Sequence, residues 1–208
     1  MYRRLIVLAT AALIAPPAYC GNLLDTIKQG LQKIDEVADS TRLTRGDNLP
    51  VRGFEDIEIG MKMEQVEGRG FQTRNADMVK VATWSKNQNE NYVALSGNQT
   101  GLVFAVTRVL TLRDQSAKTL EESLKKKYGN DSVSPTKGRV ESARKFTSLA
   151  GGSANFDKAL CYGNCAGDEG GRFFMIGVSD RQVNYVVVDE DLIRDERKRS
   201  QKELESNL

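Results

Sequence analysis

The sequence predicts an α+β fold in which an antiparallel sheet is preceded by an N-terminal amphipathic helix and followed by a charged C-terminal helix. Short apolar runs separated by turn-rich segments recur after residue 53, which is typical of paired strands. Two of these runs are joined by the tight turn Ser179-Asp180-Arg181, which predicts a hairpin. The chain then ends in a run of oppositely charged residues spaced for i,i+4 pairs, which indicates a solvated helix.

The first segment, residues 1–20, has the pattern of a signal peptide. A basic start is followed by the apolar run Leu5–Ala15 and by small residues before Gly21. The run is too short to span a bilayer, which takes about 20 apolar residues. We therefore expect the mature chain to begin at Gly21 and to be periplasmic or secreted. The alternative is membrane anchoring through a lipid on Cys20.

The next segment, 21–53, is predicted to hold an amphipathic helix over 22–38 and a polar linker. The apolar residues of that helix recur at spacings of three and four, which places them on one stripe. The remainder, 54–208, is interpreted as a single α+β domain. Two similar halves, 54–129 and 130–208, are the alternative.

Within this domain, alternation and turn residues predict most of the elements in order. A short extended piece and a short helix are expected within 57–66, and a longer helix within 116–128. Strands are expected at 79–84, 92–95, 101–112, 172–178 and 182–188. Residues 130–171 are interpreted as loop-rich, with one short strand around Arg144 to Leu149. The charged C-terminal helix is expected to begin near Asp189.

Charge and composition exclude several classes of function. Residues 1–20 contain two of the 30 lysines and arginines, so removing them leaves 28 against 28 acidic residues, and the basic excess of a nucleic-acid binder is missing. The chain has no histidine, which excludes Ser/His/Asp and Cys/His catalysis. No phosphate loop or dinucleotide motif is present, so no cofactor is predicted.

The remaining cysteines, Cys161 and Cys165, form an even pair in a chain predicted to be exported. We therefore expect a local disulfide. The alternative is a metal site that adds Asp168 and Glu169 to the two thiolates. Two cysteines without histidine do not complete a structural zinc site, so no metal is predicted.

Three further residues are candidates for binding. Arg108 falls on the same strand face as Phe104 and Leu110, where a charge must reach solvent, pair with a carboxylate or serve a ligand. Trp84 and Tyr92 are candidate contact residues if their sheet face is open, because aromatic side chains anchor interfaces. Ordinary core packing is the alternative for both aromatic residues.

The run Ile57 to Val66 has the pattern I-x-x-G-M-x-x-x-x-V. It resembles the opening of small bacterial envelope modules of the outer-membrane-assembly lipoprotein type. The later tryptophan strand with Trp84 and the hairpin over Tyr92 to Leu112 are similar to elements of that group, so the resemblance covers residues 54–112. It implies a fold like the β-lactamase-inhibitor-protein repeat, with helices packed on one face of an antiparallel sheet. It also implies a protein-binding envelope module without catalysis.

Together these observations predict a non-catalytic protein-binding or envelope accessory module, whose partner is an unknown envelope or extracellular protein. One alternative is a carboxylate-dependent hydrolase, which predicts a deep cleft with two facing acids. The acids available for such a site are Glu64, Glu67, Asp114, Glu121 and Asp168. The other alternative is a structural subunit that assembles through the 22–38 helix. No catalytic residue is singled out by a motif.

Overall fold

The computed structural model describes residues 49–76, 79–112, 120–153, 155–166 and 170–206. The chain divides into two compact units, Met1–Glu36 and Val37–Leu208, and every described residue belongs to the second. The predicted signal peptide, Cys20 and the 22–38 helix lie outside the described residues. No helix in the described part of the chain is long and apolar enough to cross a membrane.

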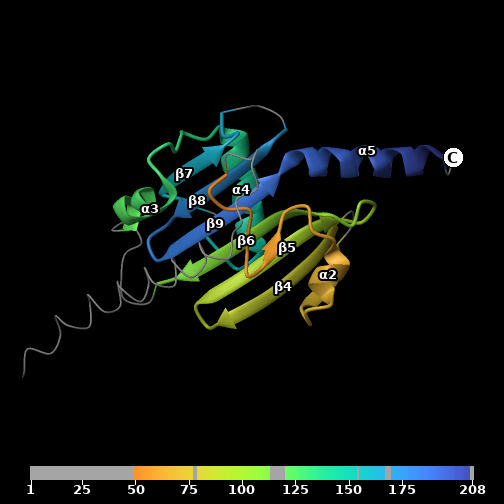
Figure 1. The fold of residues 1–208 in the computed structure, drawn as a ribbon, viewed down its shortest axis with the longest axis horizontal. Helices are drawn as coiled ribbons and strands as arrows, with labels where there is room; N and C mark the ends of the chain where they lie inside the picture. Colours follow the sequence, from red (N-terminus) through yellow and green to blue (C-terminus); the bar gives the residue numbers. More distant parts are fainter. Residues whose placement is uncertain (1–48, 77–78, 113–119, 154, 167–169, 207–208) are drawn as a thin grey trace, which may run out of the picture. The chain divides into compact units, whose positions relative to one another are not determined.

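A seven-stranded antiparallel sheet organises the described residues, with strand order β3-β4-β5-β6-β9-β8-β7 (Figure 1). Its strands are β3 (Gln72–Ala76), β4 (Val79–Asn87), β5 (Glu90–Gly97), β6 (Val103–Thr111), β7 (Lys158–Gly163), β8 (Arg172–Val178) and β9 (Gln182–Asp189). The predicted strands at 79–84, 92–95, 101–112, 172–178 and 182–188 are all confirmed. The two segments 54–129 and 130–208 meet where β6 pairs with β9, so they contribute to one continuous sheet.

Side chains of the central strands alternate between two covered faces. On β6 and β9, Val109 and Val186 point to one side, while Arg108 and Tyr185 point to the other. We call the first side the helix face, because α4 covers it, and the second the aromatic face. Residues of β5, β6, β8 and β9 are buried on both faces, which explains why these strands are nearly continuous apolar runs.

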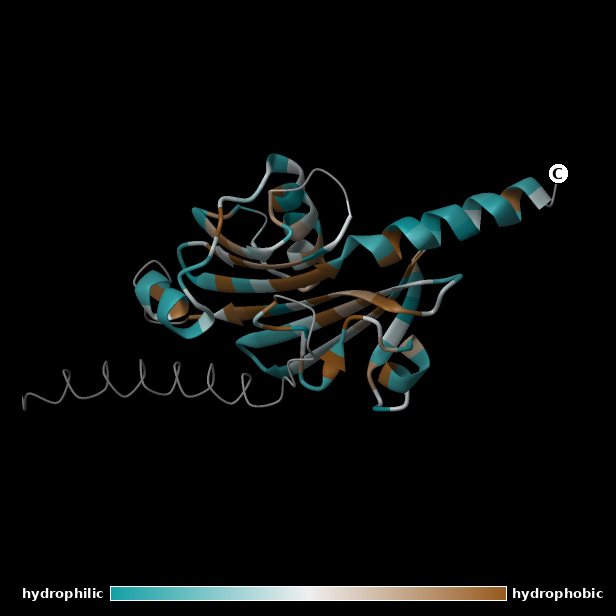
Figure 2. Ribbon diagram, turned by 45° about the horizontal axis from the view of Figure 1, so that its top comes forward, coloured by the Kyte–Doolittle hydropathy of each residue, from teal (hydrophilic) through white to brown (hydrophobic). Residues whose placement is uncertain are grey.

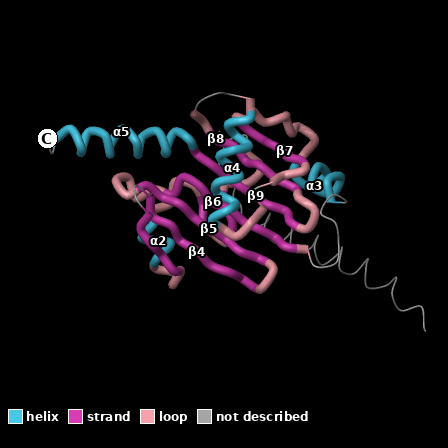
Figure 3. The backbone as a smooth tube through the Cα atoms, turned by 180° about the vertical axis from the view of Figure 1, so that it is seen from behind, coloured by secondary structure: helices cyan, strands magenta, loops and turns pink. Residues whose placement is uncertain are grey.

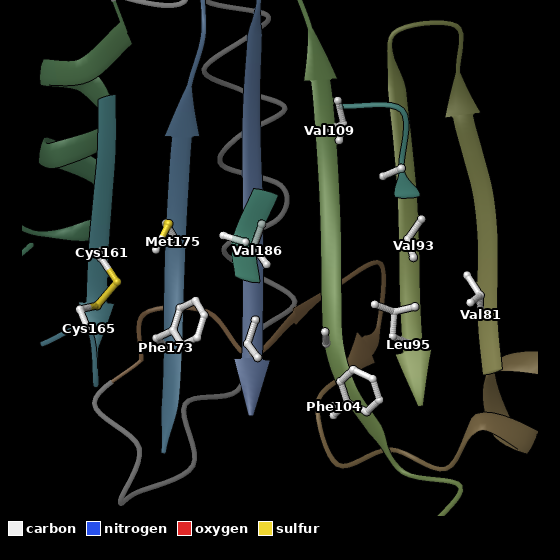
Figure 4. Packing of buried hydrophobic residues seen from close by; sticks show 14 residues of the cluster. Val81, Val93, Leu95, Phe104, Val109, Cys161, Cys165, Phe173, Met175 and Val186 are labelled. Carbon is white, nitrogen blue, oxygen red and sulfur yellow. A yellow bond between two sulfur atoms is a disulfide. The ribbon is translucent and has the colours of Figure 1, made fainter. Parts of the chain in front are cut away.

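The helix face packs against α4 (Lys137–Leu149). Its core contains Val93, Val109, Met175 and Val186 from the sheet, with the Cys161–Cys165 pair at one side (Figure 4). The Thr136 side chain caps the helix by accepting a hydrogen bond from the Arg139 backbone N–H at 3.4 Å.

The prediction of a short strand around Arg144 to Leu149 is wrong, because this segment is the second half of α4. Val140, Ala143 and Phe146 recur at spacings of three and pack on the helix face of the sheet, which is helical periodicity. The loop-rich interpretation of 130–171 also missed β7. A pattern of only six residues does not distinguish the period of a strand from that of a helix. Packing against β6 and β9 stabilises the helical conformation here.

The aromatic face is covered by the small β1–β2 hairpin (Gly53–Phe54 and Ile57–Glu58), by α2 (Met63–Glu67) and by α3 (Glu121–Tyr128). Phe54 contacts Phe174 and Tyr185 of the sheet, and Tyr128 of α3 contacts the same two rings. Helices therefore lie on both faces of the sheet. The resemblance to envelope modules implied helices on one face of the sheet only. Helix α4 lies on the helix face, but α3 lies on the opposite, aromatic face, so this part of the prediction is wrong.

The C-terminal helix α5 (Glu190–Ser206) begins directly after β9, as predicted. It is 17 residues long, or about 26 Å, and its second half extends beyond the sheet with a mainly hydrophilic surface (Figures 1 and 2). Glu196 anchors it, because its carboxylate accepts hydrogen bonds from the Gln99 and Thr100 backbone N–H groups at 2.7 and 2.8 Å. A Cβ at Gly97 would lie 2.0 Å from Glu196 Oε2, so only glycine leaves room for this anchor.

Cys161 and Cys165 lie at disulfide-bonding distance, with 1.99 Å between the two sulfur atoms, as the spacing predicts. Cys161 belongs to β7 and Cys165 follows it directly, and both are fully buried. The bridge therefore fixes the end of an edge strand against the core.

Replacing both cysteines by alanine should lower the free energy of unfolding without abolishing the fold. In the chain-entropy model a loop this short accounts for about 2 kcal/mol. Chemical denaturation of the oxidised wild type and of the double variant measures the difference. Collapse of the variant into an unfolded chain would contradict a local role for the bridge.

Substituting Glu196 by alanine should lower the free energy of unfolding by about 1.5–3 kcal/mol, because two backbone N–H groups lose a charged acceptor. The matched control is Asp195→Ala on the exposed side of the same helix, for which a change within about 0.5 kcal/mol is expected. Equal effects of the two variants in urea denaturation would show that the Glu196 contacts do not hold α5.

Candidate functional site

The three binding candidates predicted from the sequence lie together in one row across the aromatic face. Trp84 of β4 is directly opposite Tyr92 of β5, and Tyr92 is directly opposite Arg108 of β6. Arg108 is in turn opposite Tyr185 of β9. Directly opposed side chains on neighbouring strands are in contact range, so the register alone aligns these four residues.

Aromatic rings extend the row in both directions. Trp84 stacks on Tyr92 with ring centroids 5.1 Å apart, and Phe71 stacks on the other side of Trp84 at 4.5 Å. Beyond Arg108, the rings of Tyr185 and Phe174 are parallel within 6° and 6.5 Å apart. Tyr162 of β7 then stacks on Phe174 at 5.8 Å. The row therefore reaches from the start of β3 to β7, with one cation near its centre.

Arg108 is neutralised inside this row. Its Nη2 lies 2.6 Å from Glu90 Oε1, and the two side chains are 1% and 3% exposed. The guanidinium also lies 5.4 Å from the ring centroid of Tyr185 and 6.0 Å from that of Tyr92. Among the described residues, Nε and Nη1 have no hydrogen-bond acceptor, and these two rings flank the charge instead. Of the outcomes predicted for Arg108, pairing with a carboxylate is the one observed.

A second carboxylate approaches from the β1–β2 turn. The Tyr92 hydroxyl donates to Glu90 Oε1 at 2.5 Å, with Glu55 Oε1 3.2 Å away. Lys86 Nζ donates to the same Glu55 oxygen at 2.9 Å. Glu55 and Asp56 both have positive φ, 53° and 61°, as a two-residue turn between antiparallel strands requires. The hairpin thus places Glu55 over the buried pair.

The electrostatics of this cluster do not suit acid–base catalysis. Burial acts to raise the pKa of the Glu90 carboxyl, but Arg108 and the Tyr92 hydroxyl outweigh it and leave that pKa below its usual range. A general acid would need a raised carboxyl pKa. Burial raises the pKa of Tyr185 to about 12 and also raises that of Tyr92, so both hydroxyls stay protonated. The cluster is therefore an ion pair that is charged at neutral pH in an aromatic core.

The acids suggested for a hydrolase do not converge in the described structure. Glu67 pairs with Lys80 at 3.1 Å, and Glu121 pairs with Lys125 at 2.9 Å and with Lys158. Glu64 is exposed on α2. Asp114 and Asp168 lie outside the described residues. Among the residues that the structure describes, no group of three or more acids or cysteines is arranged to hold a metal ion.

An accessible groove with a volume of about 590 Å³ lies on the helix face. Its lining residues come mainly from α4, the first turns of α5, β4 and β6, and Figure 3 shows where these elements run. We call it the α4–α5 groove. Its lining residues are Val79, Phe104, Ser142, Lys145, Phe146, Gly170, Glu190, Ile193, Arg194, Glu196 and Arg197.

The two acids of this groove are used internally. Glu190 pairs with the buried Arg139, and Glu196 accepts the two backbone hydrogen bonds that anchor α5. Lys145 and Arg197, in contrast, are exposed, and within the described part of the chain no acidic side chain pairs with them. The groove therefore combines an apolar floor with a basic rim.

A second hollow of about 520 Å³ lies at the C-terminal end of α4. Leu149 and Ala150 border it on one side, and residues of β4 and β5, including Trp84 and Tyr92, border it on the other. The Tyr92 side chain is only 1% exposed, so ordinary core packing describes it better than an open contact surface. Trp84 is half-buried between its two neighbouring rings.

Comparison with known proteins gave no match: no family model fits the chain, and no curated protein or solved structure is significantly similar to it. The resemblance of residues 54–112 to envelope modules stays a prediction.

The sequence did not predict that Glu90, Glu55 and Tyr185 gather around Arg108 and Tyr92. Glu90 shares a strand face with Tyr92 because it is two residues earlier, and this alternation was the available signal. Glu55 and Tyr185 had no comparable signal, because only the folded sheet brings β1, β5 and β9 together. The α4–α5 groove was also missed, since its α4 wall, with Lys145 and Phe146, falls in a segment predicted as a loop with one short strand.

Removing the acid of the buried pair should be costly. Glu90→Ala leaves Arg108 buried without a counter-charge and should lower the free energy of unfolding by about 3–5 kcal/mol. The matched control is Glu67→Ala, which breaks the half-exposed pair with Lys80 and should leave the free energy of unfolding nearly unchanged. Urea denaturation at pH 7 compares the two variants. A similar small loss in both would mean that Arg108 does not depend on Glu90.

The difference between wild type and Glu90→Ala should also depend on pH. The pKa of Glu90 is lower in the folded than in the unfolded chain, so its contribution is complete above the unfolded value of about 4.3 and is lost as pH falls through the folded value. Denaturation midpoints measured from pH 7 downward should therefore converge in acid. A constant difference would contradict the ionised pair.

Proposed function

We propose that this chain is a non-catalytic protein-binding module that works outside the cytosol, in the periplasm or as a secreted protein. The observation that carries the proposal is the α4–α5 groove, an accessible surface in which Phe104, Phe146 and Ile193 form an apolar floor. Concave apolar sites with a few polar groups at the margin are the usual places for recognition, and volumes of about 300–1,000 Å³ are typical.

The distribution of charge supports binding rather than catalysis. The acids near the groove are held by Arg139 or by backbone N–H groups, so they stabilise the fold. The cations Lys145 and Arg197 face solvent, where they add specificity and speed of association for a partner of opposite charge. The two carboxylates that approach one another, Glu55 and Glu90, are each paired with a cation. Within the part of the chain that the structure describes, no facing pair of acids with a raised pKa supports the hydrolase alternative.

The bonded cysteine pair supports the location. Disulfides persist in oxidising compartments and are rare in the cytosol, and Cys161 and Cys165 are buried at bonding distance. This agrees with the signal-peptide pattern of residues 1–20.

Capture of the tagged full-length chain from its own host tests the proposal. We expect one protein in fixed ratio with the wild type, and a loss of about tenfold or more with the variant Lys145→Glu/Arg197→Glu, because reversed rim charges repel an acidic partner. The control Lys126→Glu/Lys202→Glu makes the same change of charge on exposed residues of α3 and α5 outside the groove.

Quantitative mass spectrometry reads the captured proteins, and denaturation midpoints confirm that both variants fold. Retention of the partner by the control but not by the groove variant would support the proposal. Equal capture by all three chains, or capture of a small molecule alone, would refute it.

A further inference from the structure

One side of α4 has no covering element among the described residues. Ser142, Lys145, Phe146 and Leu149 follow one another at spacings of three, one and three, which places them on one stripe of the helix. The first three line the α4–α5 groove, and Leu149 borders the second hollow. Leu149 is 42% exposed. The same stripe therefore faces two hollows.

The edge of the sheet on the β3 side of this stripe is exposed, although Val81, Val93 and Leu95 of β4 and β5 are buried in the core of the helix face. Helix α4 contacts β6 and β9, whereas all five residues of β3 and the last three of β4 are exposed. In Figure 3, β4 and β5 lie next to α4 with no described helix in front of them. Among the described helices, α4 covers mainly the β6 and β9 part of this face. The opening beside α4 that one more element could enter is the α4–α5 groove.

The backbone chemistry of the site favours a helix as that element. The walls of the groove are α4 and α5, whose interior backbone groups are hydrogen-bonded within each helix. No described residue of the edge strands β3 and β7 lines the groove, so an extended peptide within it has no strand edge with which to pair. A helix satisfies its own backbone and offers one apolar stripe to the floor, which is the helix-in-groove mode of recognition.

The charges of the site favour acidic flanks on that helix. Lys145 stands on the α4 wall, and Arg194 and Arg197 stand on the α5 wall, with Phe104 between them on the floor. Arg194 pairs with Asp191 on its own helix, while the other two have no acidic partner in the described residues. A lipid-like amphiphile carries its charge at one end. Cations on both walls fit a ligand with an apolar centre and negative charge on either side.

We infer that the α4–α5 groove binds an amphipathic helix of a partner protein, with acidic residues on both margins of its apolar stripe, packed beside α4. Three to four turns would match the 13 residues of α4. The inference rests on the proposed function and specifies the chemistry of the partner.

Selection from a displayed helix library tests it with the whole folded chain as bait. Each member is a 14-residue peptide with leucines at i, i+3, i+4 and i+7, and with the flanking positions randomised. We expect enrichment of Asp and Glu on both flanks. The selected peptides should bind about tenfold or more weakly to Lys145→Glu/Arg197→Glu, should bind normally to Lys126→Glu/Lys202→Glu, and should weaken as salt is added.

A charge swap gives the sharpest outcome. Peptides with lysine in place of the selected acids should bind the Lys145→Glu/Arg197→Glu chain better than the wild type.

Three results would overturn the inference: enrichment without acidic flanks, absence of any binder, or tight binding of anionic lipid vesicles in place of the peptides. If host capture is sensitive to the groove variant while the library shows no acidic preference, the inference falls and the proposed function stands. If acidic helices are selected but no host protein is captured, the proposed function falls.

Discussion

The Arg108 side chain is only 1% exposed, so its charge needs a counter-charge within the protein. The arrangement of the aromatic face depends on this requirement. Glu90 supplies the counter-charge from the neighbouring strand, and Tyr92 donates its hydroxyl to the same carboxylate oxygen. Removing two such charges from water costs several kcal/mol per ion, so the pair is tolerated only with good geometry and further contacts. The register of β5 against β6 provides that geometry.

The aromatic row follows from the same constraint. A buried cation is stabilised by ring faces, and the rings of Tyr92 and Tyr185 stand on the two strands that flank Arg108. The β1–β2 hairpin closes over the row with Phe54, and its turn brings Glu55 to Tyr92. The centre of the aromatic face around Arg108 is therefore buried, and its residues stabilise the fold.

The helix face is organised differently, and this leaves it free for recognition. Its core is made of aliphatic side chains under α4, with the Cys161–Cys165 bridge at the β7 side (Figure 4). Helix α5 leaves the sheet at Glu190, where Arg139 holds it, and Glu196 fixes its direction. Because these acids are turned to internal partners, the rim of the groove is left basic. The buried ion pair and the proposed recognition groove thus lie on opposite faces of one sheet.

The sequence by itself determined the α+β class, the paired strands 172–178 and 182–188, the C-terminal helix and the disulfide. Each of these depends on residues close together in the chain, where alternation, turn chemistry and cysteine spacing act directly. It also placed Arg108 on an apolar strand face, which follows from alternation alone. Only the tertiary structure decided which carboxylate neutralises Arg108, that 144–149 is helical, and that α4 and α5 enclose a groove. These features arise from contacts between distant segments, and packing against a sheet overrides the weak preference of a short local pattern.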